Sequence, residues 1–363
     1  MTVRPYQLSD RAAVERICTD HGLRGNLEKY FIDKDLFAKI WLAPFLDGEP
    51  DAAWVIEADG AVVGYLVAAI KDGFKMRAVR ILLPYLAKMA ANSIAGKYRH
   101  HPPSRRFVKW FLFRSWREVP AHPPNTSNFH FNIDSAFQGS ARGGEALAEA
   151  YFNRLKELGH THFYIHVFAS STKRALGFYR YIGFKIVDAK LSSLFHEPTV
   201  VTSMLRTLPE TVSLGKERVK FLPKLTVRLR FRGDLGALES ALTEISLQAL
   251  PADAVVIEVE SDPNQALRDL AERFDAPLSS ELVSAGKDDI VVTLDPELEI
   301  RPEFLALILA AYDGGTNSGV VQAESGEAFF TSRKAFASGE YPDALPKQGF
   351  PKLNLRLRLR NSR

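Results

Sequence analysis

The sequence predicts an α/β protein built from two parts. Its 363 residues exceed the roughly 100–200 residues of one ordinary domain. Strand-like and helix-like runs alternate in both halves, and a polar stretch over 209–224 separates them. Hydrophobic residues make up 46% of the chain and charged residues 25%, which excludes a mostly disordered protein.

Several other classes of protein are excluded by composition. No run approaches the roughly 20 apolar residues that span a bilayer, so a transmembrane protein is not expected. The opening MTVRPYQLSD lacks an apolar signal region, which predicts a cytoplasmic protein. The single cysteine, Cys18, excludes an intrachain disulfide and a cysteine-based zinc site, and we expect a buried thiol there.

The first half follows a strand–helix order that can be justified piece by piece. Asp59-Gly60 divides the apolar run 52–70 into a hairpin, and Gly159 ends an amphipathic helix over 145–159. The run SNFHFNID (127–134) alternates apolar and polar residues, as a half-buried strand does. The remaining expected elements are strands at 2–8, 160–169, 184–191 and 201–208, and helices at 9–23, 27–46 and 172–183.

Positive charge is concentrated in a helical insertion over 71–118. Twelve Lys or Arg and one acidic residue lie between 71 and 117, a net charge of +11 in a chain whose total is +4. The charges alternate with apolar runs at 81–90 and 107–116, which read as amphipathic helices. The insertion either packs on its own domain with solvated cations or contacts an anionic membrane surface or glycolipid. No nucleic-acid-binding motif accompanies the charge, so no nucleic-acid partner is expected.

The second half repeats a β-α pattern without sequence similarity to the first. Strands are expected at 225–231, 254–260 and 289–295, and helices at 234–250, 265–274 and 301–312. Such alternation predicts a parallel sheet with helices on its faces.

The segment 128–159 carries the most informative chemistry. A strand enters a turn rich in small residues (137–144), and a long helix leaves it. The first amides of such a helix are unpaired and partly positive, so they can bind a pyrophosphate, and small residues let it approach.

Two motifs in this half resemble the GNAT acetyltransferase superfamily over residues 1–208. The loop Gln138–Gly144 is similar to the Q/R-x-x-G-x-G/A loop of that family, although it is one residue longer and has Arg142 at the first glycine. The run 172–184 resembles the N-x-x-A-x-x-F/L-Y-x-x-x-G-F helix, with Thr172 in place of asparagine. The resemblance implies acetyl-CoA as co-substrate. The cofactor-binding residues it implies are Ile133, Ser135, Gln138, Gly139, Ser140, Ala141, Arg142, Gly143, Gly144 and Thr172.

The resemblance also implies catalytic roles. The tyrosine that matches the family's acid for the leaving thiolate is Tyr179. His130, Asn132 and Asp134 alternate on the 127–134 strand and therefore share one face. Asp134 is the first candidate for the general base or amine anchor and His130 the second, and the alternative is a satisfied polar network. No metal is expected, although His160, His162 and His166 also alternate.

Residues 225–363 resemble a shortened GT-A glycosyltransferase domain. The segment 288–309 is similar to the one that carries the D-x-D metal motif, and the match falls on Asp295-Pro296-Glu297. Pro351-Lys352 stands where that family has its carboxylate base, so the resemblance implies a domain without transfer activity.

Taken together, the sequence favours an acetyl-CoA-dependent N-acyltransferase that acts on an amine, with an amino sugar or glycan precursor as the expected acceptor. One alternative is an active nucleotide-sugar glycosyltransferase with a regulatory GNAT-like domain. The other alternative is a non-catalytic scaffold that binds CoA or lipid.

Overall fold

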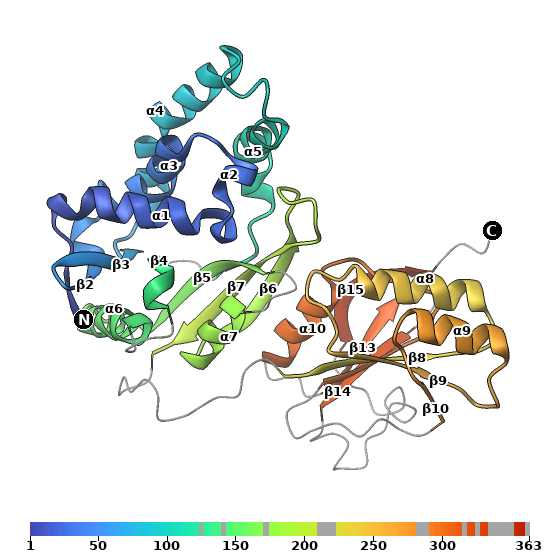
Figure 1. The fold of residues 1–363 in the computed structure, drawn as a ribbon. Coiled ribbons are helices and arrows are strands. Elements are labelled where there is room, and N and C mark those ends of the chain that lie inside the picture. Colours follow the sequence, from blue (N-terminus) through green and yellow to red (C-terminus); the bar gives the residue numbers. More distant parts are fainter. Residues whose placement is uncertain are drawn as a thin grey trace. The chain divides into compact units, whose positions relative to one another are not determined.

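The computed structural model describes residues 1–122, 126–138, 143–169, 174–208, 223–280, 290–313, 318–323, 327–332 and 352–359. The chain divides into two compact units (Figure 1). The first comprises Met1–His166, Ile182–Phe184 and Ser203–Arg218, and the second Val167–Tyr181, Lys185–Thr202 and Val219–Arg363. This division does not coincide with the polar stretch 209–224, because two segments from the first half group with the C-terminal part.

The strands predicted for the first half form one mixed sheet of seven strands. The strands are β1 (Thr2–Pro5), β2 (Ala53–Ala58), β3 (Ala61–Ala69), β4 (Ser127–Ile133), β5 (His162–Ala169), β6 (Lys185–Leu191) and β7 (Val200–Thr207). Their order is β1-β2-β3-β4-β5-β7-β6. Strands β1 to β4 pair antiparallel in succession, and β4 pairs parallel with β5. The predicted hairpin turns at Asp59 (φ 51°) and Gly60 (φ 78°), where the left-handed backbone suits these two residue types.

Helices cover both faces of the first unit's strands. They are α1 (Arg11–Gly25), α2 (Leu27–Tyr30), α3 (Lys34–Leu46), α4 (Phe74–Ile94), α5 (Pro102–Phe113) and α6 (Gly143–Glu157). Successive residues of β4 show which helix lies on which side. The Phe129 ring packs 4.9 Å from Tyr151 of α6, whereas the His130 ring lies 6.4 Å from Trp41 of α3. Accordingly α1 and α3 lie on one face and α6 on the other (Figure 1).

Aromatic side chains form the core beneath α6. The buried members of this cluster are Phe129, Tyr151, Phe152, Phe163 and Phe184. Full burial of each such ring contributes about 2–3 kcal/mol of stability. The Tyr151 hydroxyl lies 2.8 Å from the Ser127 hydroxyl, so the one polar group of this cluster is satisfied inside the core.

The predicted helix over 27–46 is two helices, because a tertiary contact interrupts it. Asp33 lies between α2 and α3 and is buried. Its Oδ2 accepts hydrogen bonds from Lys97 Nζ at 2.6 Å, Tyr98 Oη at 2.9 Å and Asn92 Nδ2 at 3.1 Å. Burial alone would raise the pKa of Asp33, but the Lys97 and Tyr98 hydrogen bonds outweigh it and lower the pKa.

The basic insertion packs on its own unit through this contact and through an aromatic one. The Phe107 ring of α5 stacks on Phe31 at 4.4 Å. In α4 itself only Met89 is fully buried. Within the described residues, no helix has both the length and the apolar character to cross a bilayer.

The second unit contains a mixed sheet of eight strands, and the parallel pairing predicted for the second half accounts for part of it. Its strands are β8 (Leu225–Arg230), β9 (Ala254–Glu258), β10 (Leu278–Ser279), β11 (Ile290–Leu294), β12 (Leu298–Glu299), β13 (Ser318–Ala323), β14 (Glu327–Ser332) and β15 (Lys352–Leu359), and its helices α7 (Arg174–Tyr181), α8 (Leu235–Ser246), α9 (Gln265–Arg273) and α10 (Phe304–Asp313). The sheet order is β10-β9-β8-β11-β14-β13-β15-β12. The first four are parallel, and β14 joins β11 antiparallel.

A buried ion pair joins α7 and β6 to α10 inside the second unit. Arg180 on α7 pairs with Asp313, the last residue of α10. The other carboxylate oxygen of Asp313 accepts the Ile186 backbone N–H of β6 at 2.8 Å. Burial raises the pKa of Asp313 even though the Arg180 charge opposes this shift. These bonds explain why α7 and β6 belong to the C-terminal unit.

We expect Asp33→Ala to lower the free energy of unfolding by about 3 kcal/mol, because the substitution leaves a lysine, a tyrosine and an amide without their shared acceptor. Chemical denaturation of the two proteins measures the difference. Asp35→Ala is the matched control, since Asp35 is 58% exposed and pairs with Lys39 at the surface, and it should change stability by less than about 0.5 kcal/mol. Equal losses for both variants would contradict the proposed role of Asp33.

Candidate functional site

The edge of β4 that faces β5 is the starting point of the candidate site. The parallel ladder joins Ser127 to Phe163 and Asn128 to Tyr164, and the described residues of these strands add no further pair to it. On the other edge, β4 pairs with β3 as far as Ile133, and the Asp134 N–H donates to Val63 on β3 at 2.8 Å. Since alternate residues of a strand direct their N–H groups to opposite edges, the Ile133 N–H points to the β5 side. Ile133 lies beyond the last residue pair of the β4–β5 ladder.

The strand continues into the predicted glycine-bearing turn and α6. Gln138 Nε2 donates to the Ile133 carbonyl at 2.9 Å, so the Gln138 side chain folds back on the strand end. Gly139, Ser140, Ala141 and Arg142 lie outside the described residues, and so does Thr172. Gly143 is buried at the first turn of α6, where an added Cβ would lie 3.1 Å from the Ile56 side chain. The helix therefore begins in close contact with the sheet, at the end of β4.

The register places two polar stripes of the sequence on one face of the sheet. Because Asn128 is opposite Tyr164, the even-numbered residues of β4 share a face with those of β5. That face carries Asn128, His130 and Asn132 on β4, and His162, Tyr164 and His166 on β5. It is the face that α1 and α3 cover.

His130 and Asn132 belong to a hydrogen-bonded network rather than an open cleft. Asn132 Nδ2 donates to the Tyr65 hydroxyl at 3.0 Å and lies 3.3 Å from His130 Nε2. The His130 ring is 5.8 Å from Tyr65, and burial lowers the pKa of His130 to about 4. His130 is therefore neutral at pH 7. Nearby, Cys18 is buried as predicted, and burial raises the pKa of its thiol to about 12.

Asp134 is held in an ion pair that the sequence did not reveal. Its Oδ2 lies 2.9 Å from Arg16 Nη2 on α1, and its Oδ1 lies 3.9 Å from His21 Nε2. Among the described residues, the His21 Nε2 atom is buried and has no hydrogen-bond partner. Arg16 and His21 carry no local motif, and only the packing of α1 on β4 brings them to Asp134. The three side chains together form a polar cluster at the end of β4.

Tyr179 lies on α7 in the second unit and is 8% exposed. Its ring contacts Phe178 edge-on at 5.6 Å. Burial raises the pKa of Tyr179 well above its usual range, so the hydroxyl keeps its proton at neutral pH.

Metal-ligating residues do not cluster in the part of the chain that the structure describes. The candidate metal residue Asp295 follows β11, and its Oδ1 lies 3.6 Å from both Arg230 Nε and Arg232 Nη2. Two guanidinium groups therefore occupy the surroundings of this carboxylate. Pro351 and Lys352 stand where the resembled family has its carboxylate base. Pro351 lies outside the described residues, and Lys352 is the first residue of β15.

The end of β4 combines backbone donors suited to a carbonyl oxygen with donors suited to phosphate oxygens. A strand N–H beyond its ladder can donate to a carbonyl oxygen that gains charge during acyl transfer. The first amides of a 15-residue helix can bind phosphate oxygens. Both groups of donors lie at the same end of the same strand.

No protein-family model and no curated protein matches this chain. Several solved structures are similar to it over the N-terminal part. A protein described as SsHAT has 24% identity, covers 58% of this chain and 98% of its own, and gives a TM-score of 0.40. The Salmonella typhimurium yncA protein, a putative acetyltransferase with its cofactor acetyl-CoA, has 17% identity, covers 60% and 98%, and gives 0.34. A ribosomal-protein-alanine N-acetyltransferase from Brucella melitensis has 14% identity, covers 57% and 100%, and gives 0.36. These TM-scores are below 0.5, so neither fold nor activity is assigned from them.

We expect the half-buried His130 and His166 of the polar face to make the free energy of unfolding depend on pH between about 7 and 4. Burial lowers the pKa of both His130 and His166 to about 4. In the unfolded chain these histidines bind protons near the ordinary pKa of 6.5, whereas in the folded protein they do so only near 4. The free energy of unfolding is therefore highest above pH 6.5 and decreases as the pH falls toward 4. Urea denaturation across this range should show a shallower pH dependence in the His130→Gln, His166→Gln double variant. His100→Gln, at an exposed position, should keep the wild-type slope.

Proposed function

We propose that this chain is a GNAT-type N-acyltransferase that transfers an acetyl group from acetyl-CoA to an amine. The observation that carries the proposal is the short parallel ladder of β4 and β5, which leaves the Ile133 N–H beyond its last pair. The glycine-bearing turn and the start of α6 follow directly. Together with the sequence motifs at 138–144 and 172–184, this arrangement supports a coenzyme thioester beside Ile133 and its diphosphate at the turn.

The proposed reaction is direct attack on the thioester. The amine nitrogen forms a bond to the acetyl carbon, the carbon–sulfur bond breaks, and the amine loses one proton. The Ile133 N–H stabilises the negative charge that develops on the carbonyl oxygen. Tyr179 supplies a proton to the departing CoA thiolate, and its raised pKa keeps it in the protonated form that an acid needs.

Asp134 and His130 are the proposed candidates for the group that receives the amine proton. Asp134 is bound to Arg16, so it would act together with this guanidinium or orient the amine. His130 is neutral at pH 7, the form that accepts a proton, but it lies among Trp41 and Tyr65. The turn residues Gln138–Gly144, with Ser135 and Thr172, are the proposed cofactor contacts.

We expect the wild-type protein to release thiol from acetyl-CoA with at least one member of a panel of amino sugars, amino acids and polyamines. Tyr179→Phe removes the proton donor and should lower kcat on the best acceptor by about a hundredfold or more. Asp134→Asn should also lower kcat if Asp134 receives or orients the amine proton. Thiol release measures each rate.

Tyr181→Phe is the matched control for Tyr179→Phe, because it removes a hydroxyl from the same helix, and its kcat should stay near the wild-type value. Wild-type activity in Tyr179→Phe would refute the acid role. If calorimetry detects no coenzyme A binding to the wild-type protein, the acyltransferase proposal itself is wrong, and the scaffold or glycosyltransferase alternatives take its place.

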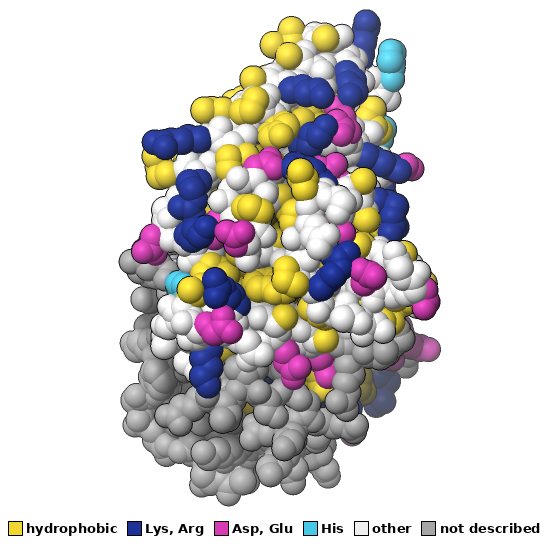
Figure 2. All heavy atoms as spheres, turned by 90° about the vertical axis from the view of Figure 1, so that its left-hand side faces the viewer, with side chains coloured by type: hydrophobic (Ala, Val, Ile, Leu, Met, Phe, Trp, Pro, Cys, Tyr) yellow, Lys and Arg dark blue, Asp and Glu magenta, His cyan; other side chains and the backbone are white. Residues whose placement is uncertain are grey.

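We also propose that α4 binds an anionic membrane surface, which makes the protein a peripheral one at the cytoplasmic face. Four apolar side chains of α4 are more than half exposed, namely Met76, Val79, Leu83 and Ile94. The first three recur at spacings of three and four residues, so they form one stripe. The exposed cations Arg80 and Lys88 come from the same helix. Figure 2 shows hydrophobic and cationic side chains interspersed over the upper part of the face of the molecule that it presents. The positive charge of the cations is complementary to acidic headgroups.

We expect vesicles that contain phosphatidylserine to retain the protein in sedimentation at low salt, with less retention as salt rises. The Val79→Glu, Leu83→Glu double variant places two carboxylates in the stripe and should lose retention. Leu247→Glu changes a side chain of similar exposure (50%) in the second unit and should be retained like wild type. Equal retention of all three proteins, or of wild type on neutral vesicles, would contradict this role of α4.

For residues 225–363 we propose a degenerate GT-A-like domain without transfer activity. The parallel β10-β9-β8-β11 order and the pairing of Asp295 with two arginines support this proposal. An amino sugar or glycan precursor is the proposed acceptor of the acyl group.

A further inference from the structure

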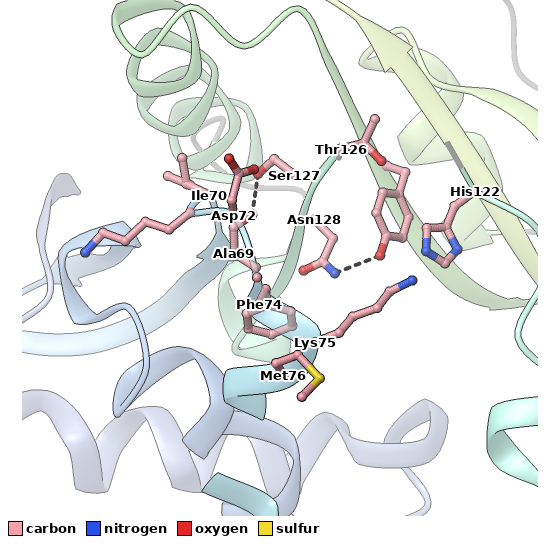
Figure 3. Close-up of a pocket in the computed structure, with 13 residues that line it drawn as sticks. Ala69, Ile70, Asp72, Phe74, Lys75, Met76, His122, Thr126, Ser127 and Asn128 are labelled. Carbon is pink, nitrogen blue, oxygen red and sulfur yellow. Dashed lines mark hydrogen bonds between the residues drawn. The ribbon is translucent and has the colours of Figure 1, made fainter. Parts of the chain in front are cut away.

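A cavity of about 260 Å³ lies in the first unit beside the first residues of β4. The glycine-bearing turn lies at the other end of this strand. The end of β3, the start of α4, the start of β4 and Tyr164 of β5 surround the cavity (Figure 3). This volume is somewhat below the roughly 300–1,000 Å³ of pockets for drug-sized ligands. It is suited to a small molecule or to one end of a larger one.

The polar wall of this cavity contains an unsatisfied hydrogen-bonding group. Asn128 Nδ2 donates to the Tyr164 hydroxyl at 3.0 Å. Asn128 Oδ1 is buried and has no hydrogen-bond partner among the described residues. Tyr164 is itself 5% exposed, and its hydroxyl accepts from Asn128, so its own proton remains available for a further acceptor. A ligand that both donates and accepts hydrogen bonds would satisfy this pair.

The Lys75 ammonium group supplies positive charge to the same wall. Figure 3 shows the Lys75 side chain extending toward His122, away from Asp72. Within the described residues, no carboxylate lies within 4 Å of Lys75 Nζ. His122 stacks on Tyr164 with ring centroids 4.4 Å apart. Burial lowers the pKa of His122, and the Lys75 charge lowers it further, so a neutral imidazole faces the ammonium group.

The other cation that lines the cavity is differently placed. Lys71 Nζ lies 3.9 Å from Asp51 and is already close to a carboxylate. Lys75 therefore provides the positive charge for which the described structure shows no counter-ion.

We propose that this cavity binds the phosphate or carboxylate group of a small molecule that also carries a hydroxyl or amine. The anionic oxygens accept hydrogen bonds from Lys75 and Tyr164, and the hydroxyl or amine donates to Asn128 Oδ1. A phosphorylated amino sugar has all of these groups.

This inference deepens the proposed function, on which its biological meaning rests. Asn128 and Ile133 lie five residues apart on β4, about 17 Å at about 3.4 Å per residue. Asn128 also shares the polar face with His130 and Asn132. An acceptor bound by its anion in the cavity would therefore have to span about 17 Å to bring its amine to a thioester beside Ile133, which requires a molecule longer than one phosphorylated sugar.

Binding can be tested without any acyl transfer. We would label histidine with ¹³C in the full-length protein and assign the His122 imidazole signal with His122→Gln. Inorganic phosphate, glucosamine 6-phosphate, glucosamine and phosphatidate vesicles are then titrated in parallel. Both phosphates should shift the His122 signal saturably and raise its apparent pKa, because a bound anion offsets the Lys75 charge. Glucosamine, which lacks the anion, should not.

Two variants and one control connect the shift to the cavity. Lys75→Met should weaken glucosamine 6-phosphate binding about tenfold, as expected for loss of one charged hydrogen bond. Asn128→Asp places a carboxylate beside the anion and should abolish the shift. Lys71→Met should bind like wild type. The Lys75 side chain is exposed, so its replacement tests the proposal even if Asn128→Asp fails to fold.

Three outcomes would overturn the proposal: a His122 shift no larger than that of the exposed His100, equal binding by Lys75→Met and wild type, or a response only to phosphatidate vesicles. The last would assign the cavity to a lipid headgroup. Phosphate binding without acyl transfer to any amine would leave the cavity proposal standing and count against the proposed function. Acyl transfer with an unchanged KM in Lys75→Met would count against the cavity alone.

Discussion

The pairing of β4 is the constraint on which the candidate site depends. One edge of this strand pairs with β3 from Asn128 to Ile133, and the described residues of the other edge pair with β5 at two positions. Backbone N–H groups are obligatory donors, and a strand edge beyond its ladder is a natural place for a ligand to supply the missing partner. The same strand then leads into α6, whose first residue is fixed against the sheet by the close contact of Gly143 with Ile56.

The two faces of β4 serve different purposes. Phe129 faces an aromatic core with Tyr151 and Phe163, which fixes the strand against α6. The opposite face carries amide and imidazole groups whose hydrogen bonds run from Tyr65 through Asn132 to His130. A strand whose core face is rigidly packed can hold polar groups in fixed positions on its other face, as binding and catalysis require.

Local signals were sufficient for most of the fold and for part of the site. The Asp59-Gly60 turn, the alternation over 127–134 and the β-α pattern after residue 225 each reflect a short-range preference, and the structure has the expected elements there. The split at Asp33 was missed because its cause lies far along the chain, at Lys97 and Tyr98. The register of β4 against β5 could not be predicted from the sequence either. The sequence shows polar stripes on β4 and β5 separately, and only the pairing of Asn128 with Tyr164 places them on one face. Arg16 and His21 meet Asp134 through helix packing, which no motif encodes.

The Arg180–Asp313 pair bears on how this chain can be divided. A fragment that stops before residue 209 keeps the guanidinium of Arg180 but loses the carboxylate that neutralises it, and the Ile186 amide loses its acceptor. Burial of a cation without its counter-ion is unfavourable in free energy, so α7 would lose its native packing in such a fragment. The C-terminal half thus stabilises the helix that carries Tyr179. Residues 1–208 expressed alone are therefore not expected to fold as an independent domain.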